Sequence, residues 1–228
     1  MNIDHINRVL KVLFRIFGRI EIVGMENIPK DGGVLLTINH LSWVDSAFVF
    51  VNVRPKRHEL SALVAKKYQS SAFFRWLVNQ VPGIWIDREN PDLQAIREAT
   101  KYLQNGGVLG IAPEGTRSKT AQLLPAKPGV VFLATRAKVP IVPTAITGTE
   151  NVVRDLSRLR RPHLTLTFGA PMMLPPIDRK RRDESLQENA DEIMCQVAAL
   201  LPESYRGHYA NHPRLRELLR TEENHPTK

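Results

Sequence analysis

The fold of this 228-residue chain is decided by the segment 34-VLLTINHLSWVDSAFVFVNV-53. Its first five residues, Val34–Ile38, form a short, largely apolar run after a turn signal, which is typical of a buried strand. Residues 43–53 are mostly apolar and predict a helix. A short polar corner, which includes Asn39, His40 and Ser42, lies between them. A buried strand that passes directly into a helix predicts a layered α/β fold.

The same alternation of strand and helix continues along the chain. Further strands are expected at 60–65, 83–87, 108–112, 141–146 and 163–168, and further helices at 70–80, 91–104, 128–138 and 183–201. Asn90 is expected to open helix 91–104. No internal repeat and no linker rich in Pro, Gly or Ser divides the chain. We therefore expect one α/β domain over 23–202, with a mixed, largely parallel sheet flanked by helices, between an N-terminal segment 1–22 and a basic C-terminal tail 203–228.

The composition fits a globular protein with an anionic partner. Hydrophobic residues make up 43% of the chain and charged residues 24%, which excludes a disordered, collagenous or multi-span membrane protein. The single cysteine, Cys195, excludes an internal disulfide and a cysteine-rich metal site. The 32 Lys and Arg residues outnumber the 23 Asp and Glu residues, giving a formal net charge of +9. That charge favours nucleic acid, phospholipid headgroups or a phosphorylated substrate without distinguishing among them.

Residues 1–20 predict an amphipathic, basic helix. Apolar side chains recur at helical spacing through residues 3–17, and basic side chains lie between and after them: Arg8, Lys11, Arg15 and Arg19. The longest uncharged apolar run there, 12–14, is far shorter than the roughly 20 residues of a membrane-spanning helix, and no signal-peptide cleavage pattern is present. Segment 1–22 is therefore expected either to lie among lipid headgroups or to pack on the domain as an ordinary helix.

A histidine and an aspartate follow the first predicted strand. His40 and Asp45 are five positions apart, which on one continuous helix separates the side chains by roughly 140°. They can meet only where a turn intervenes, and the corner between strand and helix supplies one. A carboxylate bonded to one imidazole nitrogen stabilises the imidazolium and leaves the other nitrogen to take a proton from a hydroxyl. The pair is therefore a candidate general base, and the alternative is a surface histidine near an unrelated aspartate.

Two more polar segments follow predicted strands. Pro113-Glu114-Gly115-Thr116-Arg117-Ser118 combines a carboxylate, a permissive glycine, a hydroxyl and a guanidinium, so it is suited to gripping a phosphorylated polyol. Residues 83–88 place Arg88 at the end of another strand. Each segment alone is compatible with an ordinary surface turn. Because the carboxyl ends of parallel strands meet at one edge of a sheet, the three polar segments together predict one active site there.

In their order along the chain, these segments resemble the glycerolipid acyltransferase family, typified by the 1-acylglycerol-3-phosphate acyltransferases. Residues 39–45 match the family's block of a histidine, four residues and an aspartate, and 113–118 match its Glu-Gly-Thr-Arg block. Its second block is similar to 83–88 and its apolar fourth block to 139–143. Ala65-Lys66-Lys67 and Lys127-Pro128-Gly129 are also similar to the family. The resemblance extends over residues 23–168 and implies that 23–202 is an acyltransferase domain.

The resemblance implies acyl transfer from a thioester donor to the free hydroxyl of 1-acylglycerol-3-phosphate. His40 would deprotonate that hydroxyl and Asp45 would orient His40, with no acyl-enzyme. The acceptor would be bound by a set of polar residues: Arg88 and Arg117 on the phosphate, Glu114, Gly115 and Thr116 around the glycerol, and Lys66 as added positive charge. Acyl-CoA or acyl carrier protein is the implied donor, and no metal or bound redox cofactor is expected.

The expected partners are the lysophospholipid acceptor, the acyl donor and a phospholipid surface. The chain lacks the long hydrophobic N-terminal spans of many relatives, so peripheral or monotopic association with the cytoplasmic face of the membrane is expected, through residues 3–17 and 73–78. No zinc-finger spacing, basic-zipper heptad or RNA-binding aromatic signature supports nucleic acid as a partner. Two alternatives stay open. One is an acyltransferase for another lysophospholipid, a glycolipid or an aminoacyl lipid, and the other is a noncatalytic lipid-binding protein, which would not need the histidine and aspartate.

Overall fold

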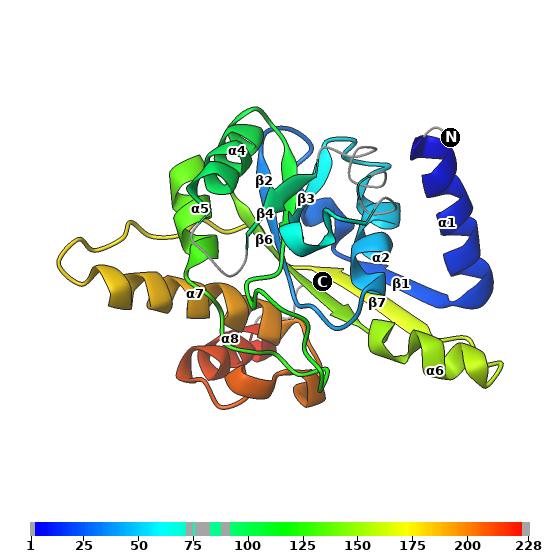
Figure 1. The fold of residues 1–228 in the computed structure, drawn as a ribbon. Coiled ribbons are helices and arrows are strands. Elements are labelled where there is room, and N and C mark those ends of the chain that lie inside the picture. Colours follow the sequence, from blue (N-terminus) through cyan, green and yellow to red (C-terminus); the bar gives the residue numbers. More distant parts are fainter. Residues whose placement is uncertain (1–2, 72–74, 76–82, 88–91, 225–228) are drawn as a thin grey trace.

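A seven-stranded sheet runs through the molecule (Figure 1). The computed structural model describes residues 3–71, 75, 83–87 and 92–224. The strand order is β1-β7-β6-β2-β5-β3-β4, and neighbouring strands in this sheet are parallel except β6 and β7. The strands are β1 (Arg19–Val23), β2 (Val34–Ile38), β3 (Leu60–Ala65), β4 (Ile84–Ile86), β5 (Val108–Ile111), β6 (Ile141–Thr147) and β7 (His163–Phe168). The mixed, largely parallel α/β sheet predicted from the sequence is confirmed.

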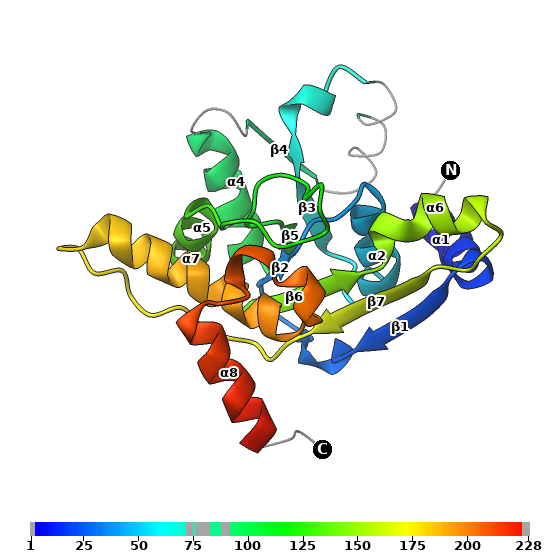
Figure 2. The ribbon, with the colours of Figure 1, turned by 90° about the horizontal axis from the view of Figure 1, so that it is seen from below.

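Helices cover both faces of this sheet (Figures 1 and 2). The helices of the described residues are α1 (Ile3–Phe17), α2 (Val44–Val53), α4 (Leu93–Gln104), α5 (Gly129–Ala137), α6 (Val152–Ser157), α7 (Arg182–Ala199) and α8 (Pro213–Asn224), of which α8 packs on α7. α2, α4 and α5 lie in crossover connections between parallel strands, and each connection passes over one intervening strand of the sheet. In the described parts of the chain, no helix combines the length and apolar character needed to cross a bilayer.

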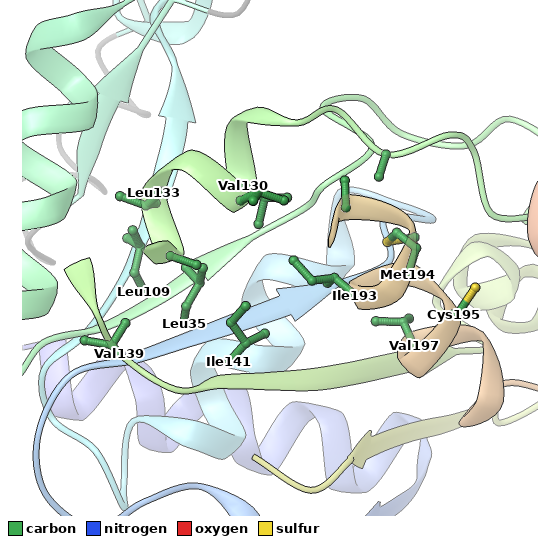
Figure 3. Close-up of a cluster of buried hydrophobic side chains, with 14 of the residues drawn as sticks. Leu35, Leu109, Val130, Leu133, Val139, Ile141, Ile193, Met194, Cys195 and Val197 are labelled. Carbon is green, nitrogen blue, oxygen red and sulfur yellow. The ribbon is translucent and has the colours of Figure 1, made fainter. Parts of the chain in front are cut away.

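The central strand β2 explains the two hydrophobic cores. Leu35 packs into the core formed with α4, α5 and α7, part of which Figure 3 shows. Val34 and Leu36 point to the opposite face, where Phe48 of α2 belongs to the same buried cluster. Side chains alternate along a strand, so a strand buried on both faces is apolar at successive positions. The same burial holds His40, which follows β2, at a fixed place on the edge of the sheet.

The N-terminal segment departs from the sequence prediction at its end. α1 stops at Phe17, and Arg19–Val23 form the edge strand β1, which pairs in parallel with β7. The prediction of one helical segment over 1–22 is therefore wrong beyond residue 17, and a boundary at 22 cuts through the sheet. Charged and apolar side chains alternate in β1, but five residues are too few for a strong strand pattern. The pairing with β7 therefore decides the conformation of this segment.

α1 itself packs on the domain through one face and leaves apolar side chains on another. The Phe14 ring lies 5.4 Å from the Phe48 ring of α2, centroid to centroid. Several large hydrophobic side chains of the same helix are exposed: Val9, Val12, Leu13, Ile16 and Phe17. The expected packing on the domain is therefore confirmed for one face, and contact of the exposed apolar face with lipid headgroups stays a prediction.

One other predicted helix begins at a different residue, and another lies mostly outside the described residues. Helix 91–104 begins at Leu93, and its N-cap is Asp92, whose carboxylate accepts the Ala95 N–H at 3.0 Å. The expected cap Asn90 lies outside the described residues. So do most of the helix expected at 70–80 and, except for residue 75, the candidate membrane contact 73–78. α6 was not predicted, because its six residues are too few for a helical pattern.

The C-terminal segment expected as a tail packs on the domain as far as the structure describes it. α8 lies against α7, and Tyr209 between them in the sequence is fully buried. The Tyr209 hydroxyl donates to Asp191 of α7 at 2.9 Å and accepts the backbone N–H of Ala126 at 2.9 Å. Residues 203–224 therefore contribute to the same core as the rest of the chain.

Candidate active site

Of the sequence-predicted site residues that the structure describes, His40, Asp45 and the loop after β5 lie together at the edge of the sheet where parallel strands end. β2, β5, β6 and β3 run in the same direction, so their carboxyl ends share one edge. His40 follows β2, Glu114 follows β5 and Lys66 follows β3. Side chains that are distant in the sequence meet there because the strand order places β2 between β5 and β6.

The His40 and Asp45 side chains are in direct contact. His40 Nδ1 lies 2.7 Å from Asp45 Oδ2, as the corner between strand and helix predicts. The same oxygen accepts the backbone N–H groups of Leu41 at 2.7 Å and Ser42 at 2.9 Å. Asp45 is buried in the first turn of α2, where the helix dipole also favours a carboxylate. Its contact with Nδ1 favours the imidazole tautomer that leaves Nε2 able to accept a proton.

The second carboxylate oxygen of Asp45 has a partner that sequence reasoning missed. Asp45 Oδ1 accepts the hydroxyl of Thr149 at 2.5 Å. Thr149 is buried and begins the 3-10 helix η3 (Thr149–Asn151) after β6. Gly148 precedes it with φ +86°, and a Cβ there would lie 1.9 Å from the carbonyl oxygen of His163, so the turn requires glycine. Only the pairing of β2 with β6 brings this hydroxyl to Asp45, and no local signal marks it.

Glu114 links the loop after β5 to the loop after β2. Its Oε1 accepts the backbone N–H of His40 at 3.1 Å, and its Oε2 accepts the backbone N–H of Leu124 at 3.0 Å. In return, the Ser118 N–H donates to the carbonyl of His40 at 2.8 Å. Burial raises the pKa of Glu114 to about 7, against the effect of these N–H donors. The sequence predicts that Glu114 shapes a glycerol site, and the structure gives its carboxylate two backbone partners.

Gly115 creates the close approach that the Glu114 loop needs. Its φ is +70°, and a Cβ there would come within 3.0 Å of the Lys127 side chain. Lys127 N–H donates to the carbonyl of Pro113 at 2.9 Å, which fixes the start of the following segment against the same loop. The Lys127 side chain therefore adds a cation beside Gly115. The sequence marks Lys127 only through the similarity of Lys127-Pro128-Gly129 to the family, which assigns this lysine no role.

Two cavities flank the loop 113–118. The larger, about 570 Å³, is lined by the cations Arg117 and Lys119, by one acidic residue, Glu150, and by apolar surface of Trp43 and Val153, among others. The smaller, about 140 Å³, is mostly apolar, and its lining includes Leu63, Ile86, Ile96, Ile111 and Leu133 together with Gly115 and Lys127. An anionic headgroup suits the first lining and a hydrocarbon chain suits the second.

Lys66 has an ion-pair partner away from the His40 corner. Its ammonium lies 2.7 Å from Asp92, the N-cap of α4. The Lys66 ammonium holds the pKa of the Asp92 carboxyl well below its usual range, and that carboxylate in turn raises the pKa of Lys66. Thr116 and Arg117 are exposed on the loop after β5. Arg88, the other predicted phosphate ligand, lies outside the described residues.

The described residues include no cluster of three His, Cys, Asp or Glu side chains that could hold a metal ion.

Comparison with known proteins identifies the family of this chain. Residues 19–147 match the family model described as Acyltransferase. The chain belongs to the acyltransferase family. The match runs from β1 through β6 and so contains His40, Asp45 and the loop 113–118.

Two curated bacterial acyltransferases illustrate the relationship. A 1-acyl-sn-glycerol-3-phosphate acyltransferase of Bacillus subtilis is 31% identical over 163 residues, covering 72% of this chain and 78% of the relative. One of Streptococcus pneumoniae is 27% identical over 207 residues, covering 90% of this chain and 75% of the relative. The fold is similar to the crystal structure of the 1-acyl-sn-glycerophosphate (LPA) acyltransferase PlsC from Thermotoga maritima. That match has a TM-score of 0.62 at 23% identity and covers 83% of this chain and 77% of the other.

Proposed function

We propose that this acyltransferase moves a fatty acyl group from a thioester to the free hydroxyl of 1-acylglycerol-3-phosphate, giving phosphatidic acid. The observation that carries the proposal is the 2.7 Å contact between His40 Nδ1 and Asp45, at the sheet edge of a chain that belongs to the acyltransferase family. The substrate is supported by its relatives, which are named 1-acyl-sn-glycerol-3-phosphate acyltransferases.

In the proposed mechanism, His40 is the general base. Its Nε2 takes the proton of the acceptor hydroxyl as the hydroxyl oxygen attacks the thioester carbonyl. The tetrahedral intermediate collapses, the C–S bond breaks, and the imidazolium returns the proton to the leaving thiolate. Asp45 stabilises the imidazolium that forms in between. Four hydrogen bonds, two from backbone N–H groups and two from hydroxyls, hold its carboxylate in place, and the dipole of α2 favours its charge.

The cavities provide sites for the two lipid parts of the reaction. Arg117, exposed and in the lining of the larger cavity, is the proposed ligand of the acceptor phosphate, because a guanidinium can bond phosphate oxygens in pairs. Arg88 and Lys66 are proposed to add positive charge, and Gly115 and Thr116 to border the glycerol. The apolar cavity beside Gly115 is proposed to take an acyl chain from acyl-CoA or acyl carrier protein.

The proposed location is the cytoplasmic face of a phospholipid membrane, with peripheral or monotopic association. The support is α1, which exposes large apolar side chains on one face while basic side chains lie along the same helix. Apolar groups that enter the headgroup region and cations that meet anionic lipid both favour such binding. The reaction as proposed needs no metal and no bound cofactor.

An acyl-transfer assay with a matched histidine control tests the proposal. Purified protein is given palmitoyl and oleoyl donors on CoA and on carrier protein, with lysophosphatidic acid and other lysolipids as acceptors. His40→Ala is expected to lower turnover by about 10² to 10⁴-fold. The control His163→Ala, at an exposed histidine on β7, is expected to keep it.

Each outcome assigns the acceptor or rejects the enzyme. His40-dependent product from lysophosphatidic acid would support the proposed substrate. Transfer only to another lysophospholipid, a glycolipid or an aminoacyl lipid would keep the mechanism and replace the acceptor. Equal activity of His40→Ala and wild type would overturn the general-base role.

A further inference from the structure

A second apolar surface lies on α6 and on the turn that follows it. Val153 and Leu156 of α6 are exposed, and Leu159 in the turn is 97% exposed. Figures 1 and 2 show this turn at one end of the molecule, on the side where β1 and α1 lie. Apolar side chains exposed together in a short segment indicate contact with something outside the chain.

The turn is built to hold Leu159 outward. Leu159 has φ +54°, a left-handed conformation that favours glycine or asparagine and is costly for a leucine. Backbone bonds fix the turn, from Leu159 N–H to the Leu156 carbonyl at 3.0 Å and from Arg160 N–H to the Asp155 carbonyl at 2.8 Å. Neither burial nor backbone conformation accounts for a leucine here, so the reason lies in what the side chain meets.

The turn is continuous with the end of α1. A guanidinium nitrogen of Arg161 donates to the carbonyls of Arg15 and Gly18, both at 2.6 Å. These bonds join the turn to the helix end that exposes Ile16 and Phe17. Exposed aliphatic and aromatic side chains from two separate elements therefore share one side of the molecule.

In the other direction the surface reaches the larger cavity. Val153 of α6 and the exposed Trp43 of the His40 corner both line that cavity, together with Arg117. The apolar surface thus extends from the cavity that holds the proposed phosphate ligand to the end of α1.

The charge of this segment selects an anionic occupant. Four arginines fall within eight residues: Arg154, Arg158, Arg160 and Arg161. Arg154 pairs with the neighbouring Asp155 at 3.2 Å, and Arg158 and Arg160 are exposed on either side of Leu159. Apolar side chains flanked by arginines match the boundary between the acyl chains and the anionic headgroups of a bilayer.

We propose that the α6 turn inserts Leu159 into an anionic phospholipid bilayer, beside the end of α1, and so sets the larger cavity against the membrane. The proposal rests on the proposed function for the statement that the cavity takes a lipid. The binding of the turn to the bilayer stands on exposure, backbone conformation and charge. A bilayer is favoured over an acidic protein because apolar contacts from two elements need no complementary groove to enter lipid.

A polarity change at position 159 tests the insertion. Leu159→Asn introduces a polar residue that tolerates the left-handed conformation, so the turn is expected to persist. Partitioning onto sucrose-loaded vesicles of 70% phosphatidylcholine and 30% phosphatidylglycerol is expected to fall about three- to tenfold. The matched control is Met173→Asn, which is expected to bind like wild type. Met173 is 59% exposed, and its neighbour Met172 pairs with Ile141 at the start of β6, whereas α6 follows the end of β6.

A fluorescent label reports insertion directly. Leu159→Cys offers an exposed thiol for bimane, whereas the native Cys195 is buried and its thiol pKa is raised to about 12, so it reacts slowly. The label at 159 is expected to shift to the blue on these vesicles and to be quenched by spin-labelled lipid. A label introduced by Met173→Cys is expected to do neither.

A charge substitution tests the role of the arginines beside Leu159. Replacing Arg158 and Arg160 together by Ser is expected to weaken binding to the anionic vesicles and to flatten its salt dependence. Wild-type binding by Leu159→Asn together with an unshifted label at 159 would overturn the proposal. A blue shift with acyl carrier protein alone, or one that rises with protein concentration without lipid, would assign the turn to a protein contact instead. Vesicle binding is measured without turnover, so failure of acyl transfer would overturn the proposed function and not this result.

Discussion

The shorter of the two hydroxyl contacts to the Asp45 carboxylate comes from Thr149, and replacing that hydroxyl tests the geometry around His40. Thr149→Val keeps the shape of the side chain and leaves Asp45 Oδ1 without its 2.5 Å donor. We expect kcat for acyl transfer to fall roughly tenfold, because a hydrogen bond to a charged group contributes about 1.5–3 kcal/mol. KM for the acceptor should stay near the wild-type value.

Rescue distinguishes a positioning role from general damage. Thr149→Ser restores the hydroxyl and is expected to recover most of kcat, while its thermal unfolding differs little from that of Thr149→Val. A kcat for Thr149→Val equal to wild type would show that the backbone N–H groups of Leu41 and Ser42 suffice to orient Asp45.

Glu114 makes stability depend on pH. Its pKa of about 7 exceeds the unfolded value, so between pH 5 and 7 the folded protein holds a proton that the unfolded chain releases. Its contribution is therefore fully present at low pH and is lost as the pH rises through 7, by at most roughly 3 kcal/mol. Thermal unfolding from pH 5 to pH 8.5 should show the advantage of wild type over Glu114→Gln shrinking with pH. The control Glu98→Gln, on the exposed face of α4, should show a constant difference.

A contact within the site could be predicted from the sequence only where both partners lie close together along the chain. The His40 and Asp45 contact was predictable because one corner between strand and helix contains both residues. The partners of Glu114 are backbone N–H groups of His40 and Leu124, which carry no sequence signature. The Thr149 hydroxyl depends on which strand lies beside β2, which a motif cannot specify.

At the scale of elements, one buried arginine joins two turns. Arg57 follows α2 and donates to the carbonyls of Pro29 at 2.5 Å, Gly32 at 2.7 Å and Gly106 at 2.9 Å. Arg57→Met removes these donors from the turns before β2 and β5. We expect the free energy of unfolding in urea to fall by about 3 kcal/mol, since buried acceptors lose partners. Lys56→Met, at the exposed neighbour, is expected to change it by less than about 0.5 kcal/mol, and an equally small effect of Arg57→Met would refute the joining role.

Elements with a strong periodic signal matched their predictions, and weak ones did not. The strand Val34–Ile38 was predicted to the residue, because both of its faces are buried and it reads as a continuous apolar run. β1 was missed, since its alternating Arg19–Val23 resembles the end of the basic helix before it. α1 shows that periodicity alone does not separate a packed face from an exposed one, because this helix carries apolar side chains on both.

The strand order belongs to the whole molecule and could not be derived from the sequence. β1 and β7 are the first and last strands along the chain, yet they are neighbours at one edge of the sheet. β7 also runs antiparallel to β6, so the chain reverses its direction in the connection that contains α6. This reversal brings the α6 turn to the end of α1, so the proposed bilayer surface is a product of topology rather than of any one segment.

The C-terminal segment gives the last prediction at this scale. A boundary at 202 would separate α7 from Tyr209, whose hydroxyl bonds both Asp191 and Ala126, and would uncover the buried Leu215 of α8. A chain ending at residue 202 is therefore expected to lose its cooperative thermal transition or to aggregate, because α7 would present its core side chains to water. A chain ending at Asn224 keeps α8 and should unfold at the wild-type temperature. Tyr209→Phe removes two hydrogen bonds while keeping the ring, so it measures how much of the lost stability comes from those bonds rather than from the buried side chains. A normal transition in the chain ending at 202 would mean that residues 203–224 rest on a core that is already complete.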